Sequence, residues 1–292
     1  MIEVGYERRD RIAYITLNRP EAKNAVTPEM HDEMCRLWAS FRDDDQADVA
    51  ILTGVGNAFC AGADLATYVP RNYVGAPPSR VREIVDLGFG GLTRGLHRIT
   101  KPTIAAVNGW ALAGGLELAL ACDLRVASDR ATFGSFEARR GFHHGDGGIT
   151  RLVNICGVGV AMQLVLTAEP IDANRALQCN MVTKVVPHEA LIEEAELLAR
   201  QILRNSQRAV RSAKETILEV HRQAAGRSAA DRGLEFLHVC RPGRGSRIVA
   251  SVLRQIGCWS SGVEFAGQIR ATASTQVVPC RQRRIVATIP AK

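Results

Sequence analysis

Residues 101–122 constrain the fold of this chain more than any other segment. An apolar run typical of a buried strand, residues 103–107, ends at Asn108-Gly109, and the pair Gly114-Gly115 then begins a helix-like stretch. Glycines before a helix leave backbone N–H groups open, where they and the helix dipole can hold a negative oxygen. Glu117 follows in the first helical turn among apolar residues, a costly place for a carboxylate unless it caps the helix or takes part in chemistry. The segment therefore predicts an oxyanion-binding backbone beside a carboxylate.

The composition is that of a soluble globular protein. The chain has 292 residues, enough for a sizeable core, with 46% hydrophobic and 23% charged residues. No uninterrupted apolar run reaches the roughly 18 residues that span a bilayer, and the charged N-terminus does not resemble a signal peptide. The 8 cysteines form neither a C-x-x-C pair nor a Cys/His metal-binding spacing. We therefore expect a cytoplasmic protein with reduced thiols and no membrane partner.

The net charge of +7 is concentrated at the C-terminal end. Residues 241–292 hold nine of the 37 basic residues and a single acid, Glu264, so residues 1–240 carry a net charge of −1. Two hypotheses explain this atypical basic tail. A reading-frame change near residues 239–241 would replace the native ending, and we favour it; alternatively, a genuine basic extension would bind an anionic partner. We do not expect nucleic acid to be a partner.

Elsewhere the pattern mixes strands and helices. Residues 3–8 and 11–17 read as two short strands joined by a tight turn, and residues 49–53 as a buried strand. A helix is predicted to begin at Thr27-Pro28, with an apolar face that includes Met30, Met34, Leu37, Trp38 and Phe41. Further expected elements are a helix over 79–99, strands over 123–127 and 131–133, and helices over 148–168, 187–201 and 206–223. This alternation predicts an α/β core with an α-helical annex.

Four segments together resemble the enoyl-CoA hydratase/isomerase (crotonase) superfamily over about residues 1–225. They are Leu17-Asn-Arg-Pro-Glu-Ala-Lys-Asn24, Gly56-Asn-Ala-Phe-Cys-Ala-Gly-Ala-Asp-Leu65, residues 101–122 and residues 133–152. The resemblance implies an α/β crotonase-like spiral of ββα units over residues 1–190. It also implies a C-terminal α-helical trimerisation region over residues 191–240, before the tail at 241–292. The implied substrate is an acyl-CoA thioester bound by a homo-trimer or hexamer without any further cofactor.

The resemblance carries an oxyanion hole to Ala63 and Gly114. Their backbone N–H groups would hold the thioester carbonyl oxygen, on which negative charge develops in an enolate-like transition state. The alternative is that the glycines of these loops only make tight turns and close packing.

Glu117 and Glu137 match the two acidic positions of the family. In its hydratases both are glutamates: one deprotonates a water that attacks C3, and the other exchanges a proton at C2. Isomerases of the family usually rely on the acid at the Glu137 position alone, so the presence of both favours an enoyl-CoA hydratase in which a water is held between the two acids. The alternative is that Glu117 caps a helix and Glu137 lies on a surface loop.

The chain departs from the family pattern around Glu137. Phe136 precedes the acid where a proline is usual, and Arg139, Arg140, His143 and His144 follow it. These residues could hold a polar acyl group or cover a solvent-facing loop. We expect no metal, because adjacent histidines are poorly placed to share one. Gly147-Gly148 could aim further N–H groups at the site or simply start a helix.

Coenzyme A is an anionic nucleotide, so the resemblance also implies substrate-binding positions, namely Lys23, Ala61, Asp64, Leu65 and Lys101. The chain has no dinucleotide-binding, Walker A or G-x-S-x-G motif, which argues against a nicotinamide enzyme or a serine hydrolase. Three functions stay open: an enoyl-CoA hydratase, an isomerase or acyl-CoA hydrolase of the same fold, and a non-catalytic binding protein that uses the basic tail.

Overall fold

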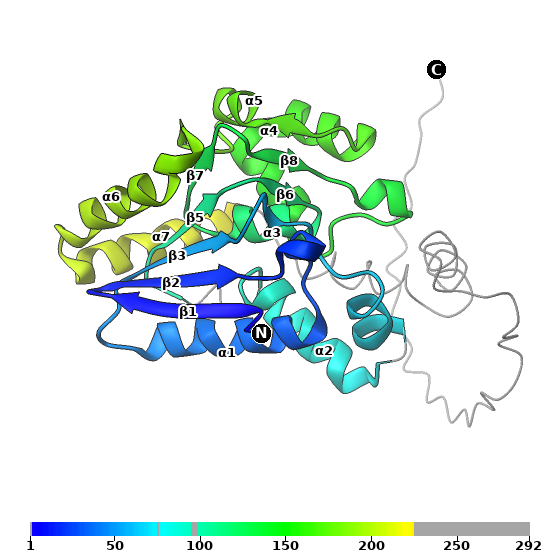
Figure 1. Ribbon diagram of the computed structural model, residues 1–292, viewed down its shortest axis with the longest axis horizontal. Helices are drawn as coiled ribbons and strands as arrows, with labels where there is room; N and C mark the ends of the chain where they lie inside the picture. The colour runs from blue at the N-terminus through cyan, green and yellow to red at the C-terminus, as the bar shows by residue number, and fades with distance from the viewer. Residues whose placement is uncertain (1, 75, 95–98, 225–292) are drawn as a thin grey trace, which may run out of the picture. The chain divides into compact units, whose positions relative to one another are not determined.

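Two β-sheets form the framework of the protein, whose computed structural model describes residues 2–74, 76–94 and 99–224 (Figure 1). The larger sheet has six strands in the order β1-β2-β3-β5-β7-β10, and the smaller has four in the order β4-β6-β8-β9. The strands are β1 (Val4–Arg9), β2 (Ile12–Leu17), β3 (Val49–Gly54), β4 (Ala58–Cys60), β5 (Thr103–Val107), β6 (Trp110–Leu112), β7 (Leu124–Ser128), β8 (Thr132–Gly134), β9 (Ile171–Asp172) and β10 (Lys184–Val186). The helices are α1 (Pro28–Asp43), α2 (Pro78–Leu87), α3 (Gly114–Ala121), α4 (Gly148–Thr167), α5 (Ala173–Gln178), α6 (Leu191–Leu203) and α7 (Gln207–Ala224).

From β3 to β8, consecutive strands alternate between the two sheets. β3, β5 and β7 lie side by side and parallel in the larger sheet, and the strands that follow them, β4, β6 and β8, lie parallel in the smaller one. Each pair of strands is followed by helical structure, so the chain advances by one strand position in both sheets at every turn. This is the spiral of ββα units that the family resemblance implied.

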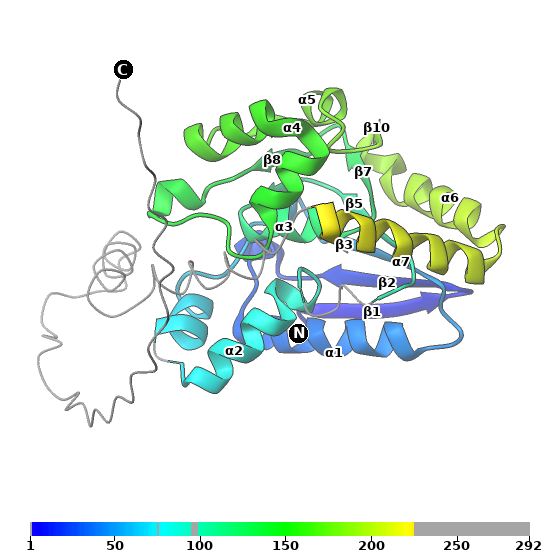
Figure 2. The same cartoon turned by 180° about the vertical axis from the view of Figure 1, so that it is seen from behind.

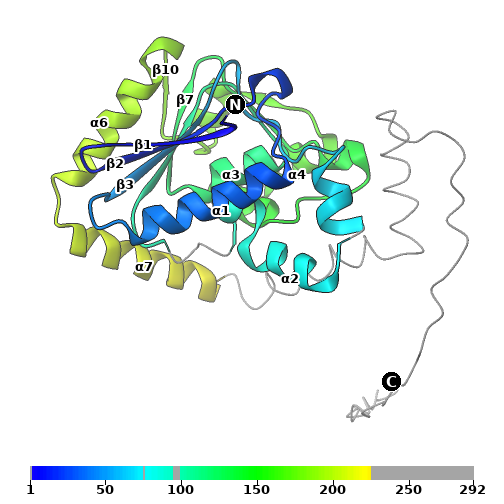
Figure 3. The same cartoon turned by 60° about the horizontal axis from the view of Figure 1, so that its bottom comes forward.

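The larger sheet is buried on both faces. Val49 and Ile51 of β3 point to one face, and Ala50 and Leu52 point to the other. The first face packs against Leu191, Ala195 and Ala199 of α6, with α7 following beside that helix (Figure 2). The opposite face meets α1, α3 and the smaller sheet, and Figure 3 shows α1 running along this side. Continuous apolar strands of this kind are typical of parallel sheets covered on both sides.

The predicted start of α1 is confirmed. The Thr27 hydroxyl accepts a hydrogen bond of 3.1 Å from the Met30 N–H, which satisfies one donor of the first turn, and Pro28 occupies the first helical position. The whole predicted apolar face is buried: Met30, Met34, Leu37, Trp38 and Phe41. The predicted hairpin is also confirmed, as β1 and β2 pair antiparallel.

The helix predicted over residues 79–99 is wrong in length. α2 ends at Leu87, and a 3-10 turn, η3 (Phe89–Gly91), follows it. Gly88 ends the helix with φ at 72°, and a side chain there would lie 2.3 Å from the Thr93 hydroxyl. Phe89 is thereby turned inward to pack against the start of α3.

Helix α4 is more apolar over its length than the search for uninterrupted apolar runs indicated. Among the described helices it alone has the length and apolar composition of a membrane span, with a mean hydropathy of 1.7 over its most apolar window. Arg151 interrupts the run in the sequence, but this side chain folds back to donate to the Asp146 and Thr93 carbonyl oxygens. The beginning of α4 is therefore part of the protein interior. Soluble core helices pass the same test of length and composition.

The predicted basic tail at 241–292, with both hypotheses for its origin, lies outside the described residues, as does the end of the predicted 191–240 region. Within that region the structure describes α6 and most of the second predicted helix, now α7.

Candidate active site

A strained turn between β6 and α3 positions the first predicted oxyanion donor. Ala113 has φ 52° and ψ −125°, a conformation rare for a residue with a side chain, and it turns the chain directly into Gly114. Gly114 is the first residue of α3, so its N–H has no partner within the helix. A side chain at Gly114 would meet the Phe89 ring at 2.8 Å, which explains why glycine stands here.

The second predicted donor, Ala63, lies in the loop that faces this turn. Ala63 forms an isolated parallel bridge with Val26, and Gly62 before it has φ 96°. A Cβ built on Gly62 would lie 3.1 Å from the Gly114 nitrogen, so the two loops are in contact. Within residues 2–74, 76–94 and 99–224, neither the Ala63 N–H nor the Gly114 N–H donates a hydrogen bond to the protein. This geometry is compatible with an oxyanion hole, which stays a prediction.

The two predicted acids meet although 20 residues separate them in the sequence. Glu117 comes from the first turn of α3, and Glu137 from the 3-10 turn η4 (Glu137–Arg140) that follows β8. Both carboxyl groups are buried, and oxygen atoms of the two lie within 4.8 Å of each other. Glu137 is therefore not a surface acid, and Ser135 donates its hydroxyl to Glu137 Oε2 over 3.3 Å.

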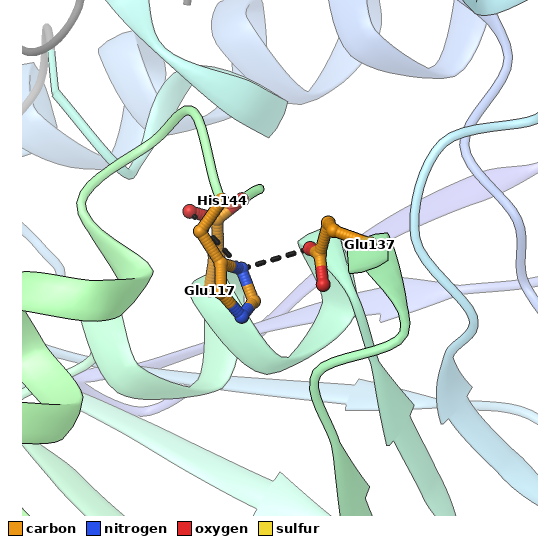
Figure 4. A group of neighbouring side chains, drawn as sticks. All are labelled: Glu117, Glu137 and His144. Atoms are coloured by element: carbon orange, nitrogen blue, oxygen red, sulfur yellow. Dashed lines mark ion pairs between the residues drawn. The ribbon is translucent and has the colours of Figure 1, made fainter. Parts of the chain in front are cut away.

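The atom that lies between the two acids is a nitrogen of His144 (Figure 4). His144 Nδ1 is 2.8 Å from Glu137 Oε1 and 3.5 Å from Glu117 Oε1, and the imidazole is fully buried. Among the described residues, neither ring nitrogen of His144 makes a well-aligned hydrogen bond. The contacts with the two glutamates are therefore ion pairs, and the Nδ1–H group points at neither carboxyl oxygen alone. The expected bridging water is replaced in this arrangement by a side chain.

The pKa values of two of the three groups are shifted by their neighbours. Burial alone would lower the pKa of His144, but the facing carboxyl groups of Glu137 and Glu117 outweigh it and raise this pKa to about 10. Burial would raise the pKa of Glu117, but the His144 charge and two backbone N–H groups outweigh it, so this pKa is lowered. Both shifts favour a protonated His144 beside an ionised Glu117.

The loop before α4 holds Glu117 from the backbone. Glu117 Oε1 accepts hydrogen bonds of 2.9 Å from the N–H groups of Asp146 and Gly148. A Cβ on Gly148 would lie 2.7 Å from the imidazole and 2.9 Å from Glu117 Cγ, so only glycine lets both side chains keep their places. Of the two hypotheses for Gly147-Gly148, the structure supports N–H groups aimed at the site.

Further charged side chains lie around the loop before α4. The buried Asp146 carboxylate accepts from the Phe89 N–H and lies 3.4 Å from the Arg94 guanidinium. Its pKa is raised to about 6, mainly by burial and then by the charge of Glu117. Arg151 donates to the Asp146 carbonyl, and Arg94 donates to the Gly145 carbonyl. Three cationic side chains therefore stand near three acids in this part of the interior.

Glu117, Glu137 and His144 are also of the types that bind divalent cations. His144 Nδ1 lies 2.8 Å from Glu137 Oε1, the distance of an ion pair, and Glu117 Oε1 already accepts two N–H bonds. The expectation of no metal stays a prediction.

The predicted coenzyme A contacts divide into two groups. Lys23, Ala61, Asp64 and Leu65 lie together beside the oxyanion loops, since Ala61 N–H donates to the Lys23 carbonyl. Lys23 Nζ donates to Asn57 Oδ1 and lies 5.5 Å from the ring centre of the exposed Trp110. The Asp64 carboxylate instead pairs with Arg19 at 2.7 Å and caps its own turn.

Lys101 is not brought to this group. Its buried ammonium donates to the carbonyl oxygens of Phe41 and Asp44, at 2.7 and 2.6 Å. Both carbonyls lie at the C-terminal end of α1, where a cation interacts favourably with the helix dipole, so Lys101 acts as a cap for that helix. The expectation that Lys101 binds coenzyme A stays a prediction, and the structure assigns its ammonium to this helix end.

His144 is the site residue that the sequence analysis missed. It was considered as a contact for a polar acyl group, which stays a prediction, or as part of a solvent-facing loop, which is wrong because its side chain is fully buried. The available signal was the pair Gly147-Gly148 just after it, which brings the loop back onto Glu117.

The sheet spiral, the facing glycine turns and the buried acid pair define an α/β protein built for chemistry on an acyl group. The chain belongs to the enoyl-CoA hydratase/isomerase family, whose model matches residues 7–235. Its chemistry is accordingly crotonase-family chemistry on acyl-CoA thioesters.

Relatives of known activity share the greater part of the chain. A short-chain-enoyl-CoA hydratase of Clostridium acetobutylicum is 38% identical over 212 residues, 72% of this chain and 79% of the relative. A crotonyl-CoA hydratase of Syntrophomonas wolfei is 39% identical over 209 residues, 71% and 78% of the two chains. Among solved structures, a carnitinyl-CoA hydratase from Mycobacterium avium superposes with a TM-score of 0.74 at 33% identity, covering 87% of this chain and 96% of that one.

Proposed function

We propose that this protein is an enoyl-CoA hydratase that adds water across the 2,3-double bond of an enoyl-CoA thioester. The observation that carries the proposal is the pair of buried carboxyl groups, Glu117 and Glu137, within 4.8 Å of each other and next to two glycine turns. The names of the relatives, both of them hydratases, support the same reaction.

In the proposed reaction the thioester oxygen accepts from the N–H groups of Ala63 and Gly114. As water adds to C3, electrons of the double bond move toward this oxygen, and the two donors stabilise the developing charge. Loss of one such donor costs on the order of 100-fold in rate. One glutamate takes a proton from the water, and the other gives a proton to C2.

Double-bond isomerisation is the second candidate, and a specific contact favours it. Glu117 Oε1 is held by two backbone N–H groups, and His144 lies where a water shared by both acids would stand. Glu137 would then carry a proton between C2 and C4 by itself, as one-acid isomerases of the family do.

The direction of the absorbance change separates the two reactions. Purified protein is mixed with crotonyl-CoA and, separately, with a 3-enoyl-CoA, while the absorbance of the conjugated enoyl thioester is followed. Hydration removes this absorbance from crotonyl-CoA, whereas isomerisation creates it from the 3-enoyl substrate. Glu137→Gln serves as the test variant, and Glu189→Gln, which alters an exposed carboxyl group paired with Arg130, is the matched control.

If crotonyl-CoA keeps its absorbance while the 3-enoyl-CoA gains it, the hydratase proposal is wrong and isomerisation replaces it. Loss of crotonyl-CoA absorbance that is unchanged in Glu137→Gln would remove Glu137 from the reaction.

A further inference from the structure

We infer that His144 is a positioning residue of this site. It holds a proton between Glu117 and Glu137, and in every catalytic cycle it transfers a proton from Glu117 to Glu137. The inference rests on the proposed hydration, in which the two acids have opposite tasks.

One ring nitrogen serves both carboxyl groups. His144 Nδ1 lies 2.8 Å from Glu137 Oε1 and 3.5 Å from Glu117 Oε1, so a small rotation of the ring directs its N–H to either oxygen without a ring flip. The imidazole is fully buried, which separates this proton from solvent. The opposing contacts come from different elements, α3 and η4, so His144 is the physical link between them.

Hydration by two acids leaves them in the wrong protonation states for the next cycle. The water oxygen bonds to C3 while its proton moves to Glu117, and the electrons of the double bond form an enolate. The enolate carbon C2 then takes a proton from Glu137, and the electrons return to the thioester carbonyl. Glu117 is left protonated, and Glu137, which starts the cycle as a carboxylate, needs a source for the proton that it delivers to C2.

His144 resolves this mismatch without a co-reactant. The proton on Nδ1 moves to Glu137 Oε1 and from there to C2, and the neutral Nδ1 then takes the proton from Glu117. Over one cycle a single water is consumed, with one hydrogen remaining on the C3 hydroxyl and one reaching C2. The imidazolium and both carboxylates are restored.

The contacts assign the two tasks. Glu117 Oε1 accepts two backbone N–H bonds, which favour its ionised form and suit it to receive a proton from water. Glu137 Oε1 is the oxygen nearer to Nδ1, so it is the group that His144 reloads.

The surrounding charges allow the imidazole to stay protonated. Besides the two glutamates, the packed elements bring Asp146 in the loop before α4, Arg151 in α4 and Arg94 beyond η3 to this region. Arg139 and Arg140 of η4 are exposed, and His143 precedes His144 in the loop. The two guanidinium groups face Asp146, whereas the carboxylates of Glu117 and Glu137 face His144. The raised pKa of His144 agrees with this arrangement.

Three variants test the inference: His144→Ala, His144→Gln and the control Glu189→Gln, which alters an exposed carboxyl group and should keep wild-type activity. We expect His144→Ala to lower kcat for crotonyl-CoA by about 100-fold, the size of a general acid–base effect, with little change in KM. Added imidazole should raise the kcat of His144→Ala at least tenfold. Among substituted imidazoles of similar size, the restored kcat should follow the pKa of the imidazole. His144→Gln, which fills the space without carrying the proton, should remain as slow as His144→Ala.

Near wild-type activity in His144→Gln would overturn the inference, because it would show that filling the space is enough. So would rescue that depends on the size of the added imidazole but not on its pKa. A stoichiometric divalent cation in the purified active protein would also overturn it and assign the three side chains to a metal site.

A measurement on the wild-type protein separates this inference from the proposed function. Nitrogen-15 NMR of the His144 ring should show an imidazolium at pH 8, and a neutral ring in the double variant Glu117→Gln, Glu137→Gln. A neutral ring in the wild-type protein at pH 8 overturns the inference whatever the activity. Lack of crotonyl-CoA hydration by a protein that shows the imidazolium would instead overturn the hydratase proposal alone.

Discussion

At the scale of single residues, Glu117 and Glu137 are held in different ways. Backbone N–H groups fix Glu117, whereas a hydroxyl and the His144 imidazole hold Glu137. Glutamine keeps an oxygen for these donors but can neither take nor release the reacting proton. We expect Glu117→Gln and Glu137→Gln each to lower hydration by 100-fold or more, since general acid–base catalysis contributes about 10²–10⁴-fold. Circular dichroism and calorimetry should show unchanged folding and acyl-CoA binding; equal activity in either variant would exclude that residue from the mechanism.

Two lysines of the coenzyme A prediction have opposite environments. Lys23 lies by the exposed Trp110 ring, whereas Lys101 caps α1 from the interior. We expect Lys23→Ala to raise KM for the CoA thioester several-fold without loss of stability. Lys101→Met should leave KM unchanged and lower the free energy of unfolding by about 1–3 kcal/mol, because it removes two charge-assisted hydrogen bonds to the end of α1. Steady-state kinetics and urea unfolding of the two variants check these expectations. A raised KM in Lys101→Met would support coenzyme A binding by Lys101.

The buried imidazolium predicts how stability depends on pH. The pKa of His144 is near 6.5 in the unfolded chain and is raised to about 10 in the folded protein. The contribution of His144 to the free energy of unfolding is therefore fully present below pH 6.5. It is lost as the pH rises toward 10, with a slope of at most roughly 1.4 kcal/mol per pH unit. Urea unfolding at several pH values should show this loss in the wild-type protein and a smaller one in His144→Gln. Identical slopes would contradict the assignment.

At the scale of elements, the first turn of α4 completes the site. Gly148 donates to Glu117 and leaves room for His144, whereas a Cβ on Gly159 of the same helix would meet nothing within 4 Å. We expect Gly148→Ala to lower hydration at least tenfold by displacing the imidazole, with folding retained because alanine favours helix. Gly159→Ala is the matched control and should keep full activity. Equal activities in the crotonyl-CoA assay would show that the site tolerates a side chain at 148.

Long elements were predictable from sequence and short ones were not. α1 was identified from its capping threonine and apolar face, and β1–β3 from apolar runs. β4 and β6 have three residues each, too few to show a period, yet they carry the smaller sheet next to both oxyanion loops. The contact of His144 with Glu117 depends on how the loop before α4 folds back, and the pair Gly147-Gly148 signals the turn but not the residue that it brings to Glu117.

At the scale of the whole molecule, α4 presents an apolar stripe to the outside. Val158, Met162 and Leu166 recur every four residues and are 58%, 54% and 73% exposed. The family resemblance implies a trimer or hexamer, and we expect further copies of the chain to cover this stripe. Light scattering should report such an assembly for the wild-type protein and a smaller species for the double variant Met162→Glu, Leu166→Glu. The control Ile2→Glu, at another exposed apolar residue, should leave the mass unchanged; a monomeric wild-type protein would contradict the expectation.

The central claim is that water is added to the substrate, and oxygen labelling tests it most directly. Crotonyl-CoA is incubated with the protein in water enriched in oxygen-18, and the product is analysed by mass spectrometry. Hydration predicts a 3-hydroxyacyl-CoA heavier than the substrate by one labelled water, with the label at C3, and its formation should be slowed in Glu117→Gln and Glu137→Gln. A product of unchanged mass, or no product from a folded protein that binds the thioester, would contradict the account.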